Sequence, residues 1–290
     1  RARFKIKRVK LMIISEIINN GSKILKNKNI RSHMIDSEII LSNVLNKKRE
    51  FILTSENYEI SKKQIEKFNC LLKRRLKSEP LAYIFNRKEF WNTSFLINKN
   101  TLIPRPETEL IVEKLVRIFQ NKSPFIIDVG TGSGCILISL LEELRFAKGI
   151  GIDISRKALE IAVKNGKKSK AKKRIKFFNK SISDRIDSKF DLIVSNPPYI
   201  CSHQFISLSN DIKNYEPKIA LNGGKDGLDV IKKIIYKARN ILRKNGMLAL
   251  EIGNGQYRKV SQILKRNKFR EKFLIKDYRE NIRCILSIIN

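Results

Sequence analysis

Apolar residues at helical spacing dominate the first part of the chain. One helix is predicted over residues 61–78, with apolar positions at Ile65, Phe68, Leu71, Leu72 and Leu76. Ser61 and Gln64 have the spacing of a capping box at its start. Residues 33–45 show a similar pattern, which predicts a second helix. Because short helices need packing partners, we predict a small helical domain over residues 12–86.

From residue 125 onward the pattern changes to short apolar runs that alternate with helical stretches. Strands are predicted at residues 125–129, 149–154, 174–179, 190–195 and 246–252, and helices at 134–145, 156–165 and 228–243. Such alternation is typical of an α/β domain with a mostly parallel sheet and helices on both faces. Two runs within residues 273–289, joined near 280–281, predict a terminal pair of strands antiparallel to the rest.

A β-hairpin is predicted between these two regions. Apolar residues 90–91 and 95–97 flank a polar turn at 92–94. Pro104 and Pro106 interrupt regular structure, so a helix should begin after Pro106. The expected organisation is a disordered extension (1–11), a helical substrate-recognition domain (12–86), a β-hairpin linker (87–104) and an α/β domain (105–290).

The composition narrows the class of protein. Hydrophobic residues make up 42% of the 290 residues, as expected for a folded globular chain. The four cysteines show no C-x-x-C spacing and only two histidines occur, so no disulfide framework, metal site or Ser-His-Asp triad is indicated. No apolar run approaches the length of a membrane span. We therefore expect a reduced cytoplasmic enzyme, without metal or membrane contact.

The net charge of +33 leaves two interpretations open. Lysine and arginine neutralise phosphates, so nucleic acid is one partner that the charge would suit. However, basic residues run through nearly every segment, and the densest patch, residues 164–176, contains no aromatic residue for base stacking. We favour a solvated surface that prefers acidic partners and has no direct need for nucleic acid.

A glycine-rich turn follows the first strand of the α/β domain. The turn reads Gly130-Thr131-Gly132-Ser133-Gly134 and is preceded by Asp128. Glycines allow positive φ and close approach to a ligand. Asp153 ends the next predicted strand, where its carboxylate can accept hydrogen bonds from both ribose hydroxyls of a nucleoside. S-adenosylmethionine is such a nucleoside, and Asp128 would help to hold its ammonium group.

Other uses of this turn remain open. An ordinary strand-to-helix turn also needs glycine for packing, and an NAD-binding oxidoreductase would place glycines at a similar point. The spacing here is G-x-G-x-G, and a dinucleotide fold normally shows G-x-G-x-x-G.

A second motif, Asn196-Pro197-Pro198-Tyr199, follows the predicted strand 190–195. Ligands bind at the carboxyl edge of open α/β sheets, although two prolines alone would favour a rigid turn. The Asn196 side-chain oxygen and the Pro197 carbonyl oxygen could each accept a hydrogen bond from one N–H group of a substrate amide. Tyr199 would add an aromatic face. Such a clamp would hold a poorly nucleophilic amide nitrogen in line with a methyl donor.

With these motifs, the chain resembles the PrmC/HemK family of peptide chain release factor glutamine N5-methyltransferases from about Met12 to the end. Asn-Pro-Pro-Tyr alone is less specific, because DNA adenine and several RNA methyltransferases share it. The further matching segments are Glu89 to Trp91, Leu102 to Glu109, Tyr215 to Pro217, Ala220-Leu221, Gly223 to Leu228, and Leu250 to Gly253 with Gln256.

The resemblance implies a Rossmann-like S-adenosylmethionine methyltransferase that modifies the glutamine of the Gly-Gly-Gln motif in class I release factors. It implies that Asn196, Pro197, Pro198 and Tyr199 bind the substrate. The implied cofactor-binding residues are Asp128, Gly130, Thr131, Gly132, Ser133, Gly134, Asp153, Ile182 and Asn196. Ser181 stands where the family usually places an aspartate near the adenine. We expect a monomer; the alternatives are a ribosomal-protein glutamine methyltransferase and a nucleic-acid amino-methyltransferase.

Overall fold

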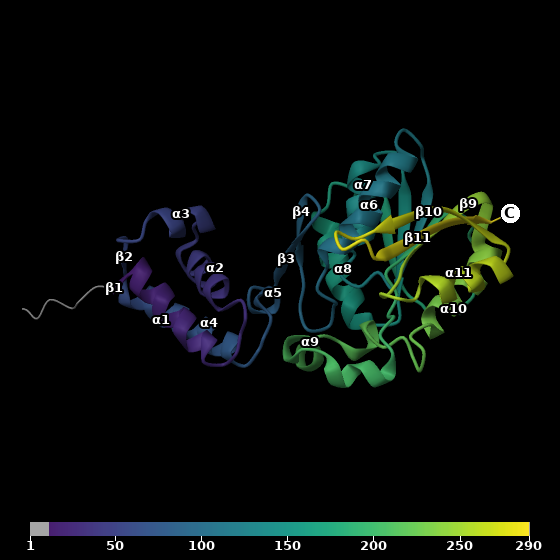
Figure 1. Cartoon of the computed structure of the whole chain (residues 1–290). Coiled ribbons are helices and arrows are strands. Elements are labelled where there is room, and N and C mark those ends of the chain that lie inside the picture. The colour runs from purple at the N-terminus through teal and green to yellow at the C-terminus, as the bar shows by residue number, and fades with distance from the viewer. Residues whose placement is uncertain (1–11, 290) are drawn as a thin grey trace, which may run out of the picture. The chain divides into compact units, whose positions relative to one another are not determined.

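The computed structural model describes residues 12–289 (Figure 1). The expected disordered extension, residues 1–11, therefore lies outside the described residues. The described chain forms two compact units, the first ending at Phe85 and the second beginning at Asn86. No helix within residues 12–289 combines the length and apolar character that crossing a membrane requires.

The first unit is helical. Its elements are β1 (Met12–Ile13), α1 (Ile14–Lys26), α2 (His33–Leu45), α3 (Arg49–Thr54), β2 (Glu59–Ile60), α4 (Lys62–Leu76) and α5 (Leu81–Ile84). The two predicted helices are confirmed, and Ser61 and Gln64 form the predicted capping box, with Ser61 N donating to Gln64 Oε1 at 2.9 Å. Buried Leu25, Leu41 and Phe68 share one apolar core.

The predicted hairpin consists of β3 (Arg87–Phe90) and β4 (Thr93–Leu96). Its turn lies at Trp91 and Asn92, one residue earlier than predicted, and Trp91 adopts a φ of 54°. Asn165 ties the hairpin to the α/β unit. It accepts a hydrogen bond from Leu96 N at 2.9 Å and donates to the carbonyl oxygens of Leu96 and Ser133, each at 2.9 Å. The hairpin therefore belongs to the second compact unit.

The second unit is built on a seven-stranded sheet with the order β10-β11-β9-β8-β5-β6-β7. The strands are β5 (Phe125–Val129), β6 (Lys148–Asp153), β7 (Ile175–Asn179), β8 (Phe190–Ser195), β9 (Leu242–Glu251), β10 (Phe269–Lys276) and β11 (Ile282–Ile289). Strands β5 to β9 pair in parallel, and β11 pairs antiparallel with both β9 and β10. The Rossmann-like α/β fold is confirmed.

The strand predictions near the end of the chain need correction. Strand β10 begins at Phe269, four residues before the predicted 273. Only β11 runs antiparallel to the rest, because a hairpin reverses the chain once and β10 therefore points the same way as β9. Strand β9 begins at Leu242, four residues before the predicted 246. The prediction missed this start because the exposed polar residues 243–245 break the apolar pattern of the strand. The pairing of β8 with β9 is irregular at the same place, between Phe190 and Leu192.

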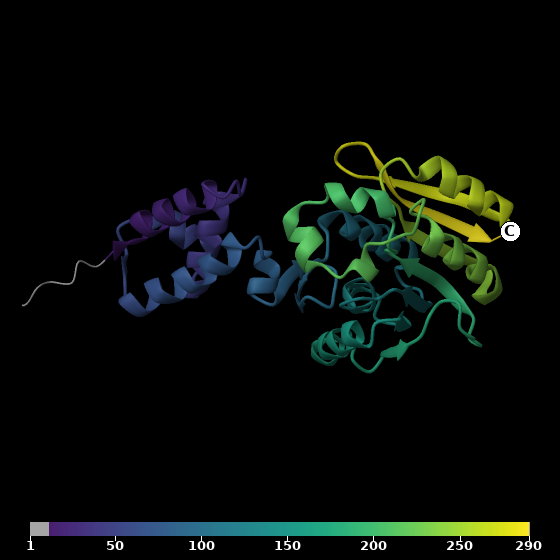
Figure 2. The ribbon, with the colours of Figure 1, turned by 90° about the horizontal axis from the view of Figure 1, so that it is seen from below.

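Helices cover both faces of the sheet. On one face, α7 (Cys135–Glu143) packs beside α6 (Pro106–Phe119) and α8 (Arg156–Lys168), and a Cβ at Gly149 of β6 would lie 2.5 Å from Leu137. On the other face, α10 (Asp229–Ile241) and α11 (Tyr257–Arg266) share an apolar cluster with Ile152 of the same strand. Strands β10 and β11 lie beside α11 in both views (Figures 1 and 2).

The strand order brings the candidate motifs together. From β5 the chain continues to β6 and β7 on one side, then returns to β8 on the other side of β5. This reversal is the topological switch point at which open α/β sheets bind ligands. The connection from β8 contains α9 (Asn210–Tyr215) and two short 3-10 helices, Ser202–Ser207 and Lys218–Ala220.

Replacing Asn165 by alanine should destabilise the second unit. Asn165 is 6% exposed, and its loss would leave backbone groups of Leu96 and Ser133 without their partner. The expected loss is about 2–4 kcal/mol of unfolding free energy, measured by urea denaturation. Asn267→Ala is the control, because Asn267 makes one local bond to Ile263 O and should cost less than about 1 kcal/mol. Equal losses for both variants would contradict the linking role of Asn165.

Candidate functional site

The glycine turn is open on the side that faces solvent. Gly130 and Gly132 have φ values of 70° and 56°, which L-residues with side chains rarely adopt. A Cβ built on Gly130 would meet no atom within 4 Å, so packing does not require this glycine. At Gly134 a Cβ would lie 3.0 Å from Ile138 and 3.3 Å from Phe177. Gly130 and Gly132 thus leave open space for a ligand at the turn, which we call the glycine cradle. Gly134 instead allows the start of α7 to pack closely against Phe177 of β7.

Asp153 braces this cradle. One carboxylate oxygen accepts a hydrogen bond from Gly132 N at 2.9 Å, and the other accepts one from Ser155 N at 2.8 Å. Burial raises the pKa of Asp153, while these backbone donors lower it. Each carboxylate oxygen has room for a second donor. Asp153 can therefore fix the loop and still accept hydrogen bonds from a ligand.

Asp128 lies beneath the turn with its carboxyl group buried. Its Oδ2 accepts a hydrogen bond from Thr131 Oγ1 at 2.7 Å, and its Oδ1 is buried without a partner among the described residues. Burial, and secondarily the charge of Asp153, raise the pKa of Asp128 to about 7. A buried acceptor of this kind is costly unless a donor or cation completes it. Asp128 is therefore suited to a cationic group or a bridging water.

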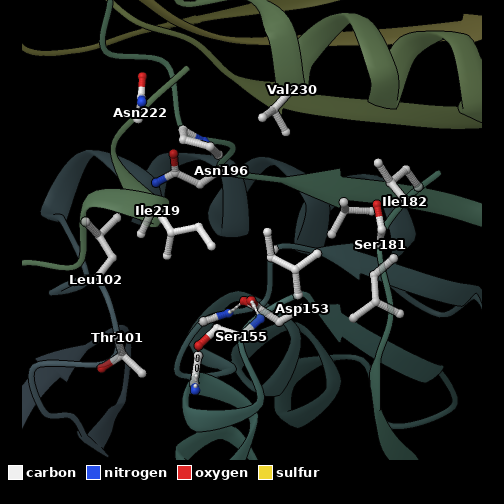
Figure 3. A pocket seen from close by; sticks show the side chains of 18 of the residues that line it. Thr101, Leu102, Asp153, Ser155, Ser181, Ile182, Asn196, Ile219, Asn222 and Val230 are labelled. Carbon is white, nitrogen blue, oxygen red and sulfur yellow. Dashed lines mark hydrogen bonds between the residues drawn. The ribbon is translucent and has the colours of Figure 1, made fainter. Parts of the chain in front are cut away.

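A cavity of about 430 Å³ lies over the switch point. Figure 3 shows Asp153 and Asn196 on facing sides of it, with Ser181 and Ile182 at one end. The predicted residues that line it are Gly130, Gly132, Asp153, Ile182, Asn196 and Pro198. Of the predicted cofactor-binding residues, Asp128, Thr131, Ser133 and Gly134 do not line it. These four lie behind or beside the cradle.

A smaller cavity of about 150 Å³ adjoins the first. Its lining includes Asn196, Pro197, Tyr199, Leu102 and Arg105. Asn196 and Leu102 line both cavities, so the two spaces meet at the first residue of the tetrapeptide. The tetrapeptide is thereby divided, with Pro198 on the larger cavity and Pro197 and Tyr199 on the smaller one.

Segments distant in sequence support the backbone of the tetrapeptide. A Cβ at Gly223 would lie 2.8 Å from Pro198 O, so this close approach requires glycine. Gln256 Nε2 donates to Tyr199 O at 2.9 Å, and Gly253 N donates to Gln256 Oε1 at 2.8 Å. Gly223 and Gln256, which belong to two of the segments that match the family, therefore fix the backbone conformation of the tetrapeptide.

The side chain of Asn196 is connected to a buried carboxyl group. Asn196 Nδ2 donates to Thr108 Oγ1 at 3.2 Å, and Thr108 Oγ1 donates to Glu251 Oε2 at 2.7 Å. Tyr199 Oη donates to Glu251 Oε1 at 3.4 Å. Burial raises the pKa of Glu251 to about 7. Burial also raises the pKa of the Tyr199 phenol, so this hydroxyl stays protonated and can donate.

An ion pair closes the wall of the smaller cavity. Arg105 pairs with Glu216, which is 5% exposed and also accepts a hydrogen bond from Ile103 N at 3.2 Å. Burial raises the pKa of Glu216, and Arg105 lowers it. This contact joins the proline-rich segment before α6 to the segment after α9.

The sequence alone indicates no role for Thr108, Glu251, Gln256 or Glu216. All four lie in segments that match the family, and this match was the feature of the sequence that could have pointed to them. Each of them has a partner more than 50 positions away, and spacing along the chain could not reveal those contacts. No group of three or more His, Cys, Asp or Glu side chains suited to a metal occurs within residues 12–289.

Ser181, at the position where an aspartate was expected, takes part in a local turn. Its backbone N–H donates to Asp184 at 2.8 Å, and its hydroxyl oxygen accepts a hydrogen bond from Ser183 N at 3.1 Å. The hydroxyl hydrogen can still be donated to a ligand at this end of the cavity.

The seven-stranded sheet, the open glycine cradle and the acidic residue at the next strand end define a Rossmann-like methyltransferase. Residues 120–254 match the family described as Methyltransferase domain, and residues 16–85 match the PrmC N-terminal domain. The fold is similar to that of a methyltransferase from Pyrococcus furiosus, with a TM-score of 0.53 and 16% identity over 74% of this chain and 98% of that chain. It is also similar to the hMettl16 catalytic domain, with a TM-score of 0.57 and 16% identity over 75% of this chain and 81% of that chain.

The chain belongs to the release factor glutamine methyltransferase family. It is 34% identical to the release factor glutamine methyltransferase of Clostridium acetobutylicum, over 96% of this chain and 99% of that protein. The corresponding protein of Caulobacter vibrioides is 35% identical over 92% of this chain and 93% of its own length. A bifunctional methyltransferase of Rickettsia typhi is 36% identical over 96% of this chain, which spans 58% of that relative.

Raising the pH should destabilise the ligand-free protein through Asp128. Its pKa rises from 3.8 to about 7 on folding, so the folded state holds a proton that the unfolded state has released. Stability therefore falls as the pH increases through this window. Asn at this position can still accept from Thr131 but does not ionise. From pH 5 to pH 8, Asp128→Asn should gain at least about 1 kcal/mol of unfolding free energy relative to wild type.

Urea unfolding at the two pH values measures this difference directly. Other ionisable groups are shared by both proteins and cancel in the comparison. If the free-energy difference between Asp128→Asn and wild type is the same at pH 5 and pH 8, the carboxyl group is not perturbed as described.

Proposed function

We propose that the chain transfers a methyl group from S-adenosylmethionine to the side-chain amide nitrogen of the glutamine in the Gly-Gly-Gln motif of class I peptide chain release factors. The observation that supports this proposal most directly is the meeting of two cavities at Asn196. The larger cavity suits a nucleoside cofactor and the smaller one a side chain. The printed names of the full-length relatives support the same acceptor.

The residues of the larger cavity fit S-adenosylmethionine. Asp128 does not line this cavity but lies beneath the glycine turn beside it, and its unpartnered Oδ1 suits the ammonium group, through a water or directly. The open space at Gly130 gives room for the amino-acid part. We propose that Asp153 accepts hydrogen bonds from the ribose hydroxyls. Ile154 and Ile182, which both line the cavity, would contact the adenine. Thr131, Ser133 and Gly134 would act by shaping the turn.

When bound, S-adenosylmethionine supplies an electrophilic methyl group on a sulfonium. The chain's own residues must hold the acceptor nitrogen, because its lone pair is delocalised into the amide carbonyl. We propose that Asn196 Oδ1 and the Pro197 carbonyl oxygen each accept a hydrogen bond from one N–H group of the glutamine amide. Tyr199 then packs against the flat face of this amide. Two fixed acceptors also stabilise the positive charge that develops on the nitrogen. No general base is required for the transfer itself.

The helical unit is proposed to recognise the acceptor protein. Its residues 16–85 match the PrmC N-terminal domain. The net charge of +33 would favour encounter with an acidic protein surface without any direct need for nucleic acid. We also propose that the protein is a monomer and works in the cytoplasm, where translation termination takes place.

Labelling of candidate acceptors tests the function. The protein is incubated with methyl-labelled S-adenosylmethionine and, separately, with a release factor, ribosomal proteins, total RNA and DNA. Label is expected in the release factor, on the glutamine of its Gly-Gly-Gln motif. Labelling of RNA, DNA or a ribosomal protein with the release factor left unlabelled would replace the proposal by one of the alternatives that share Asn-Pro-Pro-Tyr.

A pair of variants separates cofactor binding from amide positioning. Asp153→Ala should weaken binding of S-adenosylmethionine, measured by calorimetry, by about 1.5–3 kcal/mol because the ribose loses a charged acceptor. Asn196→Ala should bind the cofactor nearly normally and lose methyl transfer by a factor on the order of a hundred or more. Asn196→Asp keeps an acceptor and should retain partial activity.

The two results can contradict the assignment independently. Unchanged affinity in Asp153→Ala would remove this residue from the cofactor site. Near-normal turnover in Asn196→Ala, with the product still mapped to the same glutamine, would leave Asn-Pro-Pro-Tyr as a rigid turn.

A further inference from the structure

A buried carboxylate lies directly behind the proposed amide clamp. Glu251 is the last residue of β9 and is 2% exposed, and its two oxygens accept hydrogen bonds from Thr108 at 2.7 Å and Tyr199 at 3.4 Å. Thr108 is 2% exposed and accepts a hydrogen bond from Asn196 Nδ2 at 3.2 Å. The clamp, α6 and the end of β9 are thus joined by a continuous hydrogen-bonded chain.

The direction of these hydrogen bonds is set by the chemistry of the carboxylate. An ionised carboxylate only accepts, so the Thr108 hydroxyl must point its one hydrogen toward Glu251. The Thr108 oxygen then presents only lone pairs to Asn196. The NH₂ group of the Asn196 amide satisfies these lone pairs, whereas its oxygen would be repelled by them. The Asn196 oxygen must therefore point away from Thr108 and stay available as an acceptor.

We infer that Glu251 and Thr108 are positioning residues that select the amide orientation of Asn196 in which its oxygen is free to accept the substrate N–H. This inference rests on the proposed function, because the proposed function is what requires the Asn196 oxygen as an acceptor. Neither residue touches the reacting atoms. They act only through the side chain of Asn196 and, for Glu251, also through the hydroxyl of Tyr199.

The protonation state of Glu251 should control this selection. Burial raises its pKa to about 7, against the lowering effects of the Thr108 and Tyr199 hydrogen bonds and the charge of Arg283 on β11, while Glu107 on α6 raises it. Cys284, opposite Glu251 in the β9–β11 pairing, stays a neutral thiol because burial raises its pKa. Below pH 7 the protonated carboxyl must itself donate one hydrogen, which competes with the hydroxyls that point toward it.

The competing explanation is that the Thr108–Glu251 bond merely fastens α6 to the sheet. A matched control exists elsewhere in the same unit. Thr93 Oγ1 donates to Glu142 Oε2 at 2.9 Å, which is also a threonine–glutamate bond between separate elements. Thr93 lies outside both cavities. Thr93→Val therefore measures the structural cost of losing one such bond without disturbing the clamp.

The first experiment compares Thr108→Val, Thr108→Ser and Thr93→Val with a release factor as acceptor. Thr108→Val should lower kcat by about ten- to a hundredfold, because the amide of Asn196 loses its fixed orientation. Its affinity for S-adenosylmethionine should stay within about threefold of wild type, since the cofactor is held mainly elsewhere. Thr108→Ser keeps the hydroxyl and should restore most of the activity, and Thr93→Val should leave kcat unchanged.

The pH dependence gives a second measure. In wild type, kcat should rise as Glu251 ionises through about pH 7, and Glu251→Gln should flatten this rise because glutamine does not ionise. A Thr108→Val variant with near-normal kcat, a loss no larger than that of Thr93→Val, or no recovery in Thr108→Ser would overturn the inference.

A readout without any acceptor distinguishes failure of this inference from failure of the proposed function. The side-chain NH₂ signals of Asn196 in a ¹⁵N NMR spectrum should shift with an apparent pKa near 7 in wild type and not in Glu251→Gln. They should move in Thr108→Val but not in Thr93→Val. If wild type modifies no release factor while these signals behave as stated, only the proposed acceptor is wrong. If the signals do not respond, the positioning inference is wrong whatever the activity.

Discussion

The parallel pairing of β5 with β8 is the constraint on which the site depends. It aligns Asp128 with Val194, so the glycine turn and the Asn-Pro-Pro-Tyr segment leave the sheet side by side. Ser195 Oγ donates to Val129 O at 2.6 Å and continues this link beyond the ladder. Because both strands are buried, a change of register would move apolar side chains to the wrong face, and the two motifs are held together by the core itself.

A tetrapeptide at a strand end has little structure of its own, and four distant segments stabilise it. Gly223 lets its own backbone approach the Pro198 carbonyl closely, and Gln256 donates a hydrogen bond to the Tyr199 carbonyl. Thr108 contacts the Asn196 side chain, while Arg105 pairs with Glu216 at the wall of the smaller cavity. The segments that mark the family in the sequence therefore surround its central motif in the structure, and most of them act on the backbone or through another side chain.

Asp128 and Glu251 are buried carboxyl groups in a chain with a net charge of +33. The lysines lie mainly at the surface, where water screens them, so they do little to stabilise Asp128 or Glu251 in the interior. Burial instead raises the pKa of each to about 7. Asp128 lacks one hydrogen-bond partner and Glu251 is satisfied by two hydroxyls, which fits a ligand-completed group in the first case and an internal positioning group in the second.

The sequence by itself determined the order of elements and the two motifs, because apolar periodicity and glycine or proline placement act locally. It predicted β5 and β8 to the residue and the capping box of α4, but it missed the start of β9 and the direction of β10, which depend on pairing across the sheet. It likewise could not show that Thr131, Ser133 and Gly134 lie off the cavity or that Thr108 and Glu251 stand behind Asn196. Only the tertiary structure decided these points, because hydrogen bonds between residues 88 and 143 positions apart leave no periodic trace along the chain.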